Sequence, residues 1–253
     1  MTGVAGDEPE AAAAAGQTGA ERSVDRRRLL AGVSIFSSLD ERALDALVRV
    51  TTTRTLEAGE VLFRKGDPGR QLFGVLAGRL KVLTSGADGK DFVMNLCDPG
   101  EVIGEIALLD SNPRSATIVA HERSRLLVLD RRDFLPFLER HPRVAIELAE
   151  LLARRLRRLS ELAEDSLLLA LQARIAKKLL SLAERYGRPT PEGLLIDLPL
   201  SQQELGDMVG ASRESINKQL RAWTQEGILL SSTGLFTLRN RAAFEALARL
   251  AID

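Results

Sequence analysis

The sequence predicts an α+β protein with an N-terminal antiparallel β-roll, one long helix and a C-terminal winged helix-turn-helix. Three patterns predict it: short apolar stretches broken by glycines, then a long apolar heptad, then two capped helices joined at a glycine turn. At 253 residues the chain is long enough for two modest domains. We expect a disordered tail over 1–25, the β-roll domain over 26–140, the long helix over 141–169 and the winged domain over 170–253.

Composition excludes several classes of protein. Apolar residues make up 45% of the chain and charged residues 28%, which is typical of a soluble globular protein. The 35 Lys and Arg residues balance the 35 Asp and Glu residues, so any contact with nucleic acid has to rest on a local motif. One cysteine, Cys97, and two histidines, His121 and His141, are too few for a cysteine-ligated cluster or a three-histidine metal site. We expect no metal, no haem and no iron–sulfur cluster.

The segment after the tail has one alternative interpretation. Arg26, Arg27 and Arg28 precede an apolar stretch over 29–36, a pattern that superficially resembles a secretory signal. The stretch is too short, it contains Gly32, and it begins far from Met1. No run approaches the roughly 18 apolar residues of a membrane span. We therefore expect a cytoplasmic protein without a membrane partner.

Turn residues dominate the first half of the chain. A capping box at Ser38 and Glu41 predicts a short helix that ends near Val50. From Thr51 to Asp130, short apolar stretches alternate with glycine and Pro-Gly turns. Turn signals every 8–12 residues are typical of a sandwich or barrel, which is why we expect an antiparallel β-roll here.

The long helix carries an apolar seam. Pro142 suits the first position of a helix, and no Gly or Pro follows until after residue 166. The seam alternates steps of four and three along Ala145, Ala149, Leu152, Leu156, Leu159, Ala163, Ser166 and Ala170. Such a heptad suits a two-stranded coiled coil, so we interpret this segment as the dimerisation helix of a homodimer. The alternative is a helix that lies on its own β-domain.

A second helix follows the seam. We expect it over Leu171 to Tyr186, closed by Gly187 in the left-handed position that commonly ends a helix. Residues 188–193 are expected to form a loop, and residues 194–198 a strand.

The segment from Ser201 to Leu238 has the spacing of a winged helix-turn-helix. Ser201 and Glu204 form a capping box, Gly210 supplies the turn, and Ser212 caps a second helix. Two short strands over 228–230 and 235–238 form the wing.

The second helix of this motif has a polar free side with Arg213, Glu214, Asn217, Lys218 and Arg221. Arg and Lys donate hydrogen bonds to guanine and Glu accepts one from cytosine, which is how proteins read a major groove. Ser201, Gln202 and Ser212 lie at helix starts, where phosphates bind. The alternative is an ordinary solvated helix face.

Two segments together resemble the cyclic-AMP receptor / FNR (Crp/Fnr) family of bacterial transcription factors. Residues 104–117 are similar to the family's phosphate-binding cassette, and residues 209–218 are similar to its recognition helix. The resemblance covers about residues 29–238. It implies a homodimer without catalytic residues or enzyme activity that binds double-stranded DNA at a palindromic TGTGA-like operator and works with RNA polymerase.

The resemblance also implies a cyclic-nucleotide site. Its cassette positions are Gly104, Glu105, Ile106, Ala107, Arg114 and Ser115. Arg114 and the Ser115 hydroxyl suit a phosphodiester, Glu105 suits the ribose 2′-OH, and Gly104 allows close approach of the backbone. Glu105 and Arg114 can instead pair with one another.

The long helix completes this site in the family. Family members place a Thr-Ser pair against adenine, and the matching positions here are Leu159 and Ser160. Leucine cannot hydrogen-bond the base, so both cAMP and cGMP are candidate effectors. The resemblance places Arg155 near Glu105. At the recognition helix, Lys218 replaces a frequent arginine, which favours a relaxed preference at one base.

Three other functions compete with a regulator gated by a cyclic nucleotide. One is a ligand-independent regulator of the same family with a vestigial pocket. A redox or gas sensor needs more cysteines or haem ligands than the chain has, and a jelly-roll enzyme needs more histidines.

Overall fold

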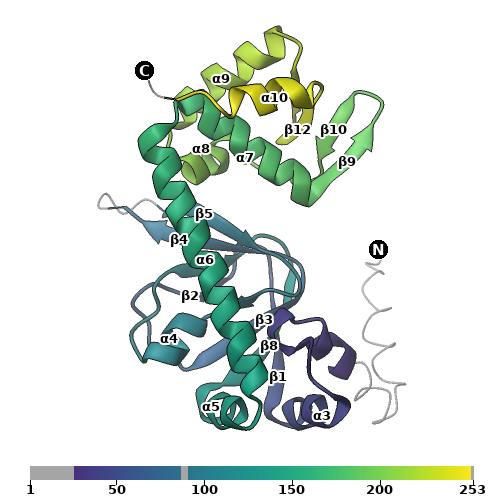
Figure 1. Cartoon of the computed structure of the whole chain (residues 1–253), viewed down its shortest axis with the longest axis vertical. Coiled ribbons are helices and arrows are strands. Elements are labelled where there is room, and N and C mark those ends of the chain that lie inside the picture. Colours follow the sequence, from purple (N-terminus) through teal and green to yellow (C-terminus); the bar gives the residue numbers. More distant parts are fainter. Residues whose placement is uncertain (1–25, 87–90, 252–253) are drawn as a thin grey trace, which may run out of the picture. The chain divides into compact units, whose positions relative to one another are not determined.

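The computed structural model describes residues 26–86 and 91–251, so the expected tail lies outside the described residues. The chain divides into two compact units (Figure 1). The first unit comprises Met1–Leu80 and Cys97–Leu151, and the second comprises Lys81–Leu96 and Leu152–Asp253. The division passes through one long helix, α6 (Pro142–Leu168). The domain limits given above stay a prediction.

The first unit begins with helical turns. Residues 26–31 are helical, a 3-10 turn η1 follows at Ser34–Phe36, and α3 spans Glu41–Val50. The capping box expected at Ser38 is wrong. Asp40 is the N-cap of α3, and its side chain accepts a hydrogen bond from the Ala43 N–H at 2.8 Å. Both Asp and Ser cap helices well, and here the helix begins later than the Ser38 pattern indicated.

The predicted α+β class and antiparallel β-roll are confirmed. The strands are β1 (Thr51–Leu56), β2 (Val61–Phe63), β3 (Gln71–Ala77), β4 (Leu80–Ser85), β5 (Asp91–Cys97), β6 (Val102–Ile103), β7 (Thr117–Ala120) and β8 (Ser124–Asp130). They form two four-stranded sheets, in the orders β1-β8-β3-β6 and β2-β7-β4-β5. A short helix, α4 (Glu105–Asp110), interrupts the strands between β6 and β7.

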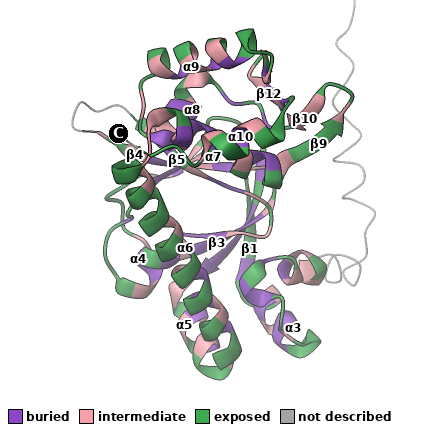
Figure 2. Ribbon diagram, turned by 45° about the horizontal axis from the view of Figure 1, so that its top comes forward, coloured by how far each residue is buried: buried purple, intermediate pink, exposed green. Residues whose placement is uncertain are grey.

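The core of the first unit joins one sheet to the helices beside it. Leu72 and Leu129 of the sheet pack in one cluster with Phe36 and with Phe134 of α5 (Arg131–Arg140). The two phenylalanine rings meet edge to face at 6.4 Å between centroids. The start of α6 joins this cluster through Val144, Leu148 and Leu151. Figure 2 shows most of the remaining length of α6 as exposed or intermediate.

In the second unit, α7 (Leu171–Tyr186) has the predicted bounds, but its predicted ending is wrong. Gly187 has φ −72°, which is not left-handed, and it begins strand β9 (Gly187–Thr190). The expected loop is therefore half of a hairpin with β10 (Gly193–Ile196). A Cβ at position 187 would collide with the Ala183 carbonyl oxygen. Close approach of two backbones explains this glycine.

The rest of the second unit is the winged helix-turn-helix. It consists of α8 (Gln202–Val209), α9 (Arg213–Gln225), β11 (Leu229–Ser232), β12 (Leu235–Leu238) and α10 (Arg241–Leu247). The wing is larger than predicted, because β11 and β12 continue into β10 and β9 as one four-stranded sheet. Trp223 of α9 is buried against Phe244 of α10, with ring centroids 5.1 Å apart. Among the described residues, no helix is long and apolar enough to cross a membrane.

Candidate functional site

Arg114 is the centre of the candidate ligand site in the first unit. Its side chain is buried, with 5% of its surface exposed. Nη1 donates to the Gly104 carbonyl and Nη2 to the Gln71 carbonyl, both at 2.9 Å. The guanidinium also lies 4.1 Å from the centre of the Phe63 ring. Nε is buried and donates no hydrogen bond, so one charged donor of the site remains unused.

The charge of Arg114 is only partly compensated. Burial lowers the pKa of Arg114 below its ordinary value, and the carboxylates of Glu105 and Asp67 oppose that effect without cancelling it. Glu105 is itself buried, with 2% of its surface exposed. Within the described part of the chain, Arg114 takes part in none of the ion pairs. The direct Glu105–Arg114 pair, the structural alternative for this site, is therefore not formed.

Two glycines allow the backbone to close around Arg114. Gly104 has φ +82°, and a Cβ there would lie 2.5 Å from Nη1 of Arg114. Gly69 allows a second close approach, because a Cβ there would collide with Ala107 and lie 3.2 Å from Nε of Arg114. Sequence analysis missed Gly69, Gln71 and Phe63. The cluster of turn glycines before β3 was the available signal for Gly69.

The other cassette residues differ in exposure. Ala107 is buried, whereas Ile106 is 43% exposed and Ser115 is exposed. The structure thus brings Gly104 and Arg114 into direct contact and leaves Ile106 and Ser115 at the surface of the first unit.

The long-helix residues predicted for the ligand belong to the second unit. Leu159 is 52% exposed, and Arg155 is half-buried. The Ser160 hydroxyl donates to the Leu156 carbonyl at 3.2 Å, a bond that a ligand base would have to replace. The position of Leu159 and Ser160 beside the cassette residues stays a prediction. The contact between Arg155 and Glu105 also stays a prediction.

The helix-turn-helix is built as its sequence predicted. Ser201 and Glu204 form a reciprocal capping box at the start of α8, and Gly210 is left-handed with φ +67°. Ser212 caps α9 by accepting from the Ser215 N–H at 3.2 Å. At Gly206, an added Cβ would lie 2.7 Å from the Ala211 carbonyl oxygen, which explains how α8 approaches the turn so closely.

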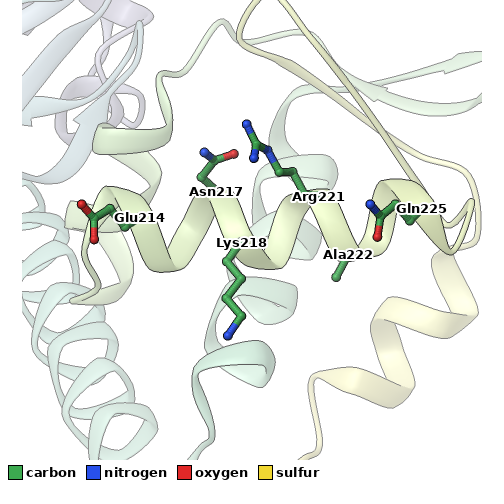
Figure 3. Close-up of a pocket in the computed structure, with 6 residues that line it drawn as sticks. All are labelled: Glu214, Asn217, Lys218, Arg221, Ala222 and Gln225. Carbon is green, nitrogen blue, oxygen red and sulfur yellow. The ribbon is translucent and has the colours of Figure 1, made fainter.

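One side of α9 is buried and the other is polar and exposed. Ile216, Leu220 and Trp223 are buried in the second unit. The opposite side lines a shallow hollow of about 460 Å³ through Glu214, Asn217, Lys218, Arg221, Ala222 and Gln225 (Figure 3). Figure 3 shows the Asn217 and Arg221 side chains pointing to one edge of this face and the Lys218 side chain to the opposite edge. Arg213 is also exposed. This face combines donors and an acceptor, as a reader of base edges requires.

Two of the three residues proposed for phosphates, Ser201 and Ser212, are also helix caps. The Ser201 hydroxyl donates to the Glu204 carboxylate at 2.9 Å and accepts from its backbone N–H at 3.1 Å. Gln202 is half-buried at the start of α8. The Ser201 hydroxyl therefore already makes two hydrogen bonds to Glu204, and a phosphate would have to compete with them.

The hairpin of β4 and β5 contacts α8 within the second unit. The Lys81 ammonium lies 2.5 Å from the Glu204 carboxylate, and the Val93 N–H donates to the Asp207 carboxylate at 3.2 Å. Burial acts to raise the pKa of Glu204, but the hydrogen bonds from Lys81 and Ser201 outweigh it, so the pKa lies below its ordinary value. Glu204 thus stabilises both the start of α8 and its contact with the hairpin.

Comparison with known proteins identifies the domain that holds the Arg114 site and the domain that holds the helix-turn-helix. Residues 53–141 match the model of the cyclic nucleotide-binding domain, and residues 173–247 match that of the Crp-like helix-turn-helix domain. The chain is 34% identical over 218 residues to the cyclic AMP receptor protein of Thermus thermophilus, which covers 86% of this chain and 97% of that relative. The chain belongs to the Crp/Fnr family. It is thus a DNA-binding transcription regulator with a cyclic nucleotide-binding domain.

A further curated relative and a solved structure of the same fold agree with this assignment. A CRP-like cAMP-activated global transcriptional regulator of Mycobacterium tuberculosis is 30% identical over 199 residues, covering 79% of this chain and 89% of the relative. These relatives are transcriptional regulators rather than enzymes, which agrees at family level with the expected absence of catalysis. The c-di-GMP-responsive global regulator CLP of Xanthomonas campestris shares the fold, with a TM-score of 0.72 at 22% identity, covering 79% of this chain and 100% of that one.

Glu204→Gln should destabilise the second unit in a pH-dependent way. The loss of the charge-assisted bonds to Lys81 and Ser201 is expected to cost about 1.5–3 kcal/mol at pH 7. Because the folded-state pKa of Glu204 is lowered, the carboxylate stabilises the fold above its unfolded pKa. That contribution disappears as the pH falls through the folded pKa. Urea unfolding followed by Trp223 fluorescence at pH 7 and pH 4 measures the difference between wild type and variant, which should shrink at pH 4. An equal difference at both pH values contradicts this account.

Proposed function

We propose that this Crp/Fnr protein is a homodimeric regulator gated by cAMP or cGMP that binds a palindromic operator with TGTGA-like half-sites. The observation that carries the proposal is the buried Arg114, a cation with an unused donor and no carboxylate in ion-pair contact. A cyclic phosphodiester carries one negative charge and would compensate it. The buried Glu105 can accept the ribose 2′-OH. The residues present therefore fit a cyclic nucleotide.

Binding of the nucleotide requires a local exchange of hydrogen bonds. The Gly104 and Gln71 carbonyls now accept the two Nη donors of Arg114, so the phosphate either uses Nε or replaces a carbonyl. The same carbonyl bonds favour the ligand-independent regulator as the alternative, because they stabilise the pocket without an effector.

Exposed apolar residues of α6 support the homodimer. Leu156 is 67% exposed and Leu159 is 52% exposed, although an apolar seam of this length is usually covered. The residues of α6 that pack in the first-unit core are Val144, Leu148 and Leu151, which are not seam positions. The core contacts of α6 thus use a different set of positions from the seam. A second copy would bury this seam.

The dimer and the operator depend on each other. Two recognition helices of a symmetric dimer read half-sites about one helical turn, roughly 34 Å, apart. The exposed Arg213, Glu214 and Lys218 of α9 supply the base contacts in this proposal. A cyclic nucleotide would act by favouring the dimer geometry that aims both α9 helices at DNA. We further propose that the protein acts in the cytoplasm, together with RNA polymerase.

Arg114→Ala should abolish binding of cyclic nucleotides while leaving the fold intact. Calorimetric titration of wild type with cAMP and cGMP side by side identifies the effector, and the same titration of the variant tests the site. Arg123→Ala removes an exposed arginine of the first unit and should bind as wild type does. Normal binding by Arg114→Ala would show that the cassette interpretation is wrong. Equal operator affinity of wild type with and without either nucleotide would favour the ligand-independent regulator.

Leu156→Glu should dissociate the homodimer. In a symmetric seam the two carboxylates would face each other in an apolar contact, which should weaken association by about 100-fold or more. Sedimentation equilibrium at micromolar concentration measures the effect. Arg157→Glu, an exposed neighbour outside the seam, is the matched control and should remain dimeric. A wild-type protein that sediments as a monomer contradicts the proposal.

Arg213→Ala should weaken operator binding by about 1–3 kcal/mol, or about 5- to 150-fold, because one guanine contact in each half-site is lost. Fluorescence anisotropy with a palindromic duplex, at fixed salt and with the effector present, measures the affinity. Substituting the contacted base should then cost the variant less than it costs wild type. Arg241→Ala on α10 is the control and should leave affinity unchanged. An unchanged affinity of Arg213→Ala would remove this residue from the interface.

A further inference from the structure

Arg174 is a half-buried arginine that lies at the turn of the helix-turn-helix, although it comes from α7. It belongs to the first turn of α7, which packs beside α8 (Figure 1). Its Nη1 donates to the Val209 carbonyl, at the C-terminal end of α8, at 2.9 Å. A Cβ at Gly210, the left-handed residue of the turn, would lie 3.6 Å from Nη1. The guanidinium is therefore directly beside the turn that joins α8 to α9.

Arg174 uses only part of its hydrogen-bonding capacity. Nε is buried and has no hydrogen-bond partner. Nη2 donates to none of the residues in the described ranges 26–86 and 91–251, and it is not a buried atom, so it reaches solvent. Within the same ranges Arg174 forms no ion pair. The Val209 carbonyl satisfies one donor of the guanidinium and leaves its positive charge without a counter-charge.

The bond to Val209 gives Arg174 a structural role that explains only one of its donors. A cation at the C-terminal end of a helix satisfies a free carbonyl and interacts favourably with the helix dipole. A lysine at this position would supply the same interaction with a single donor. This role does not account for the planar group whose second nitrogen, Nη2, points to solvent beside the turn.

The turn is a place where a helix-turn-helix protein meets the DNA backbone. The first helix of the motif crosses the backbone, and the N-terminal residues of the second helix contact base edges. The hydroxyl nearest the turn is already engaged, because Ser212 accepts from the Ser215 N–H at 3.2 Å and its oxygen lies 2.9 Å from the Ser215 hydroxyl. Arg174 is thus the charged donor that this corner offers to a phosphate.

We propose that Arg174 binds a phosphate of the DNA backbone at the edge of the groove that α9 enters. Nη2 would donate to the phosphate while Nη1 keeps its bond to the Val209 carbonyl, so one side chain would join the DNA backbone to the end of α8. Phosphate contacts fix the register and orientation of a protein on the duplex. The inference rests on the proposed function in one respect, DNA binding by the second unit, and depends on neither the operator sequence nor the effector.

The salt dependence of DNA binding by the full chain tests this contact. Each phosphate contact contributes about 0.9 to the slope of log affinity against log salt concentration. Arg174→Gln removes one contact per copy, so the slope for a bound dimer should fall by about 1.8. Between 50 and 200 mM salt, wild type should therefore lose about 12-fold more affinity than the variant. Fluorescence anisotropy with a duplex of mixed sequence measures this without operator or effector.

Three further variants separate the contact from a structural role. Arg174→Lys keeps the charge and should keep the wild-type slope, whereas Arg174→Met keeps the unbranched stem without charge and should match Arg174→Gln. Lys177→Gln removes a cation of the same helix that already pairs with Asp165, and it should leave the slope unchanged. A displaced α9 would lower affinity at every salt concentration without a change of slope. A wild-type slope in both uncharged variants, or an equal fall in Lys177→Gln, overturns the proposal.

Sequence preference distinguishes this contact from base reading. Arg174→Gln should weaken binding to the proposed operator and to the mixed-sequence duplex by the same factor, whereas Arg213→Ala should lower the ratio of the two affinities. A changed ratio with an unchanged slope in Arg174→Gln overturns the phosphate contact, as does a wild type that binds neither duplex. A slope that falls by about 0.9 supports the contact and indicates one bound copy. An operator without preferred binding contradicts the proposed operator alone, because the slope measured on mixed sequence still decides on Arg174.

Discussion

A buried guanidinium constrains the first unit. Arg114 is held between two backbone carbonyls and an aromatic ring, an environment that satisfies two of its donor groups without neutralising its charge. Such an arrangement forms only where the backbone can approach closely. Gly104 and Gly69 have no Cβ to prevent it. The sheet, the short helix α4 and the turn before β3 are thus arranged around one cation, and an anionic effector is the natural counterpart of that arrangement.

The long helix α6 carries three different surfaces. At its start, Val144 and Leu148 belong to the core of the first unit. Further along, Leu156 and Leu159 present an apolar seam to solvent. A third side faces α7, where Asp165 pairs with Lys177. A single element with three surfaces can transmit a change at one of them to the others, which is what a regulator with separate ligand and DNA regions requires.

Local sequence patterns predicted local structure well. The capping box at Ser201, the left-handed Gly210 and the bounds of α7 depend on residues close in sequence, and each was predicted correctly. One local prediction was wrong, because Asp40 rather than Ser38 caps α3. The other errors occurred where a distant contact decides. Gly187 was assigned to a helix end, but its role is to let β9 pass the Ala183 carbonyl. The carbonyls that bind Arg114 also escaped prediction, because nothing near Gln71 in sequence indicates that its backbone meets residue 114.

The positions of the aromatic residues have an optical consequence. The chain has one tryptophan and one tyrosine, Trp223 and Tyr186, and both belong to the second unit. Trp223 is buried beside Phe244, directly behind the exposed face of α9. Ultraviolet emission excited at 295 nm therefore originates wholly within the winged helix-turn-helix unit. The β-roll contains phenylalanine but neither tryptophan nor tyrosine. Intrinsic fluorescence excited at 295 nm therefore reports on the second unit and not on the β-roll.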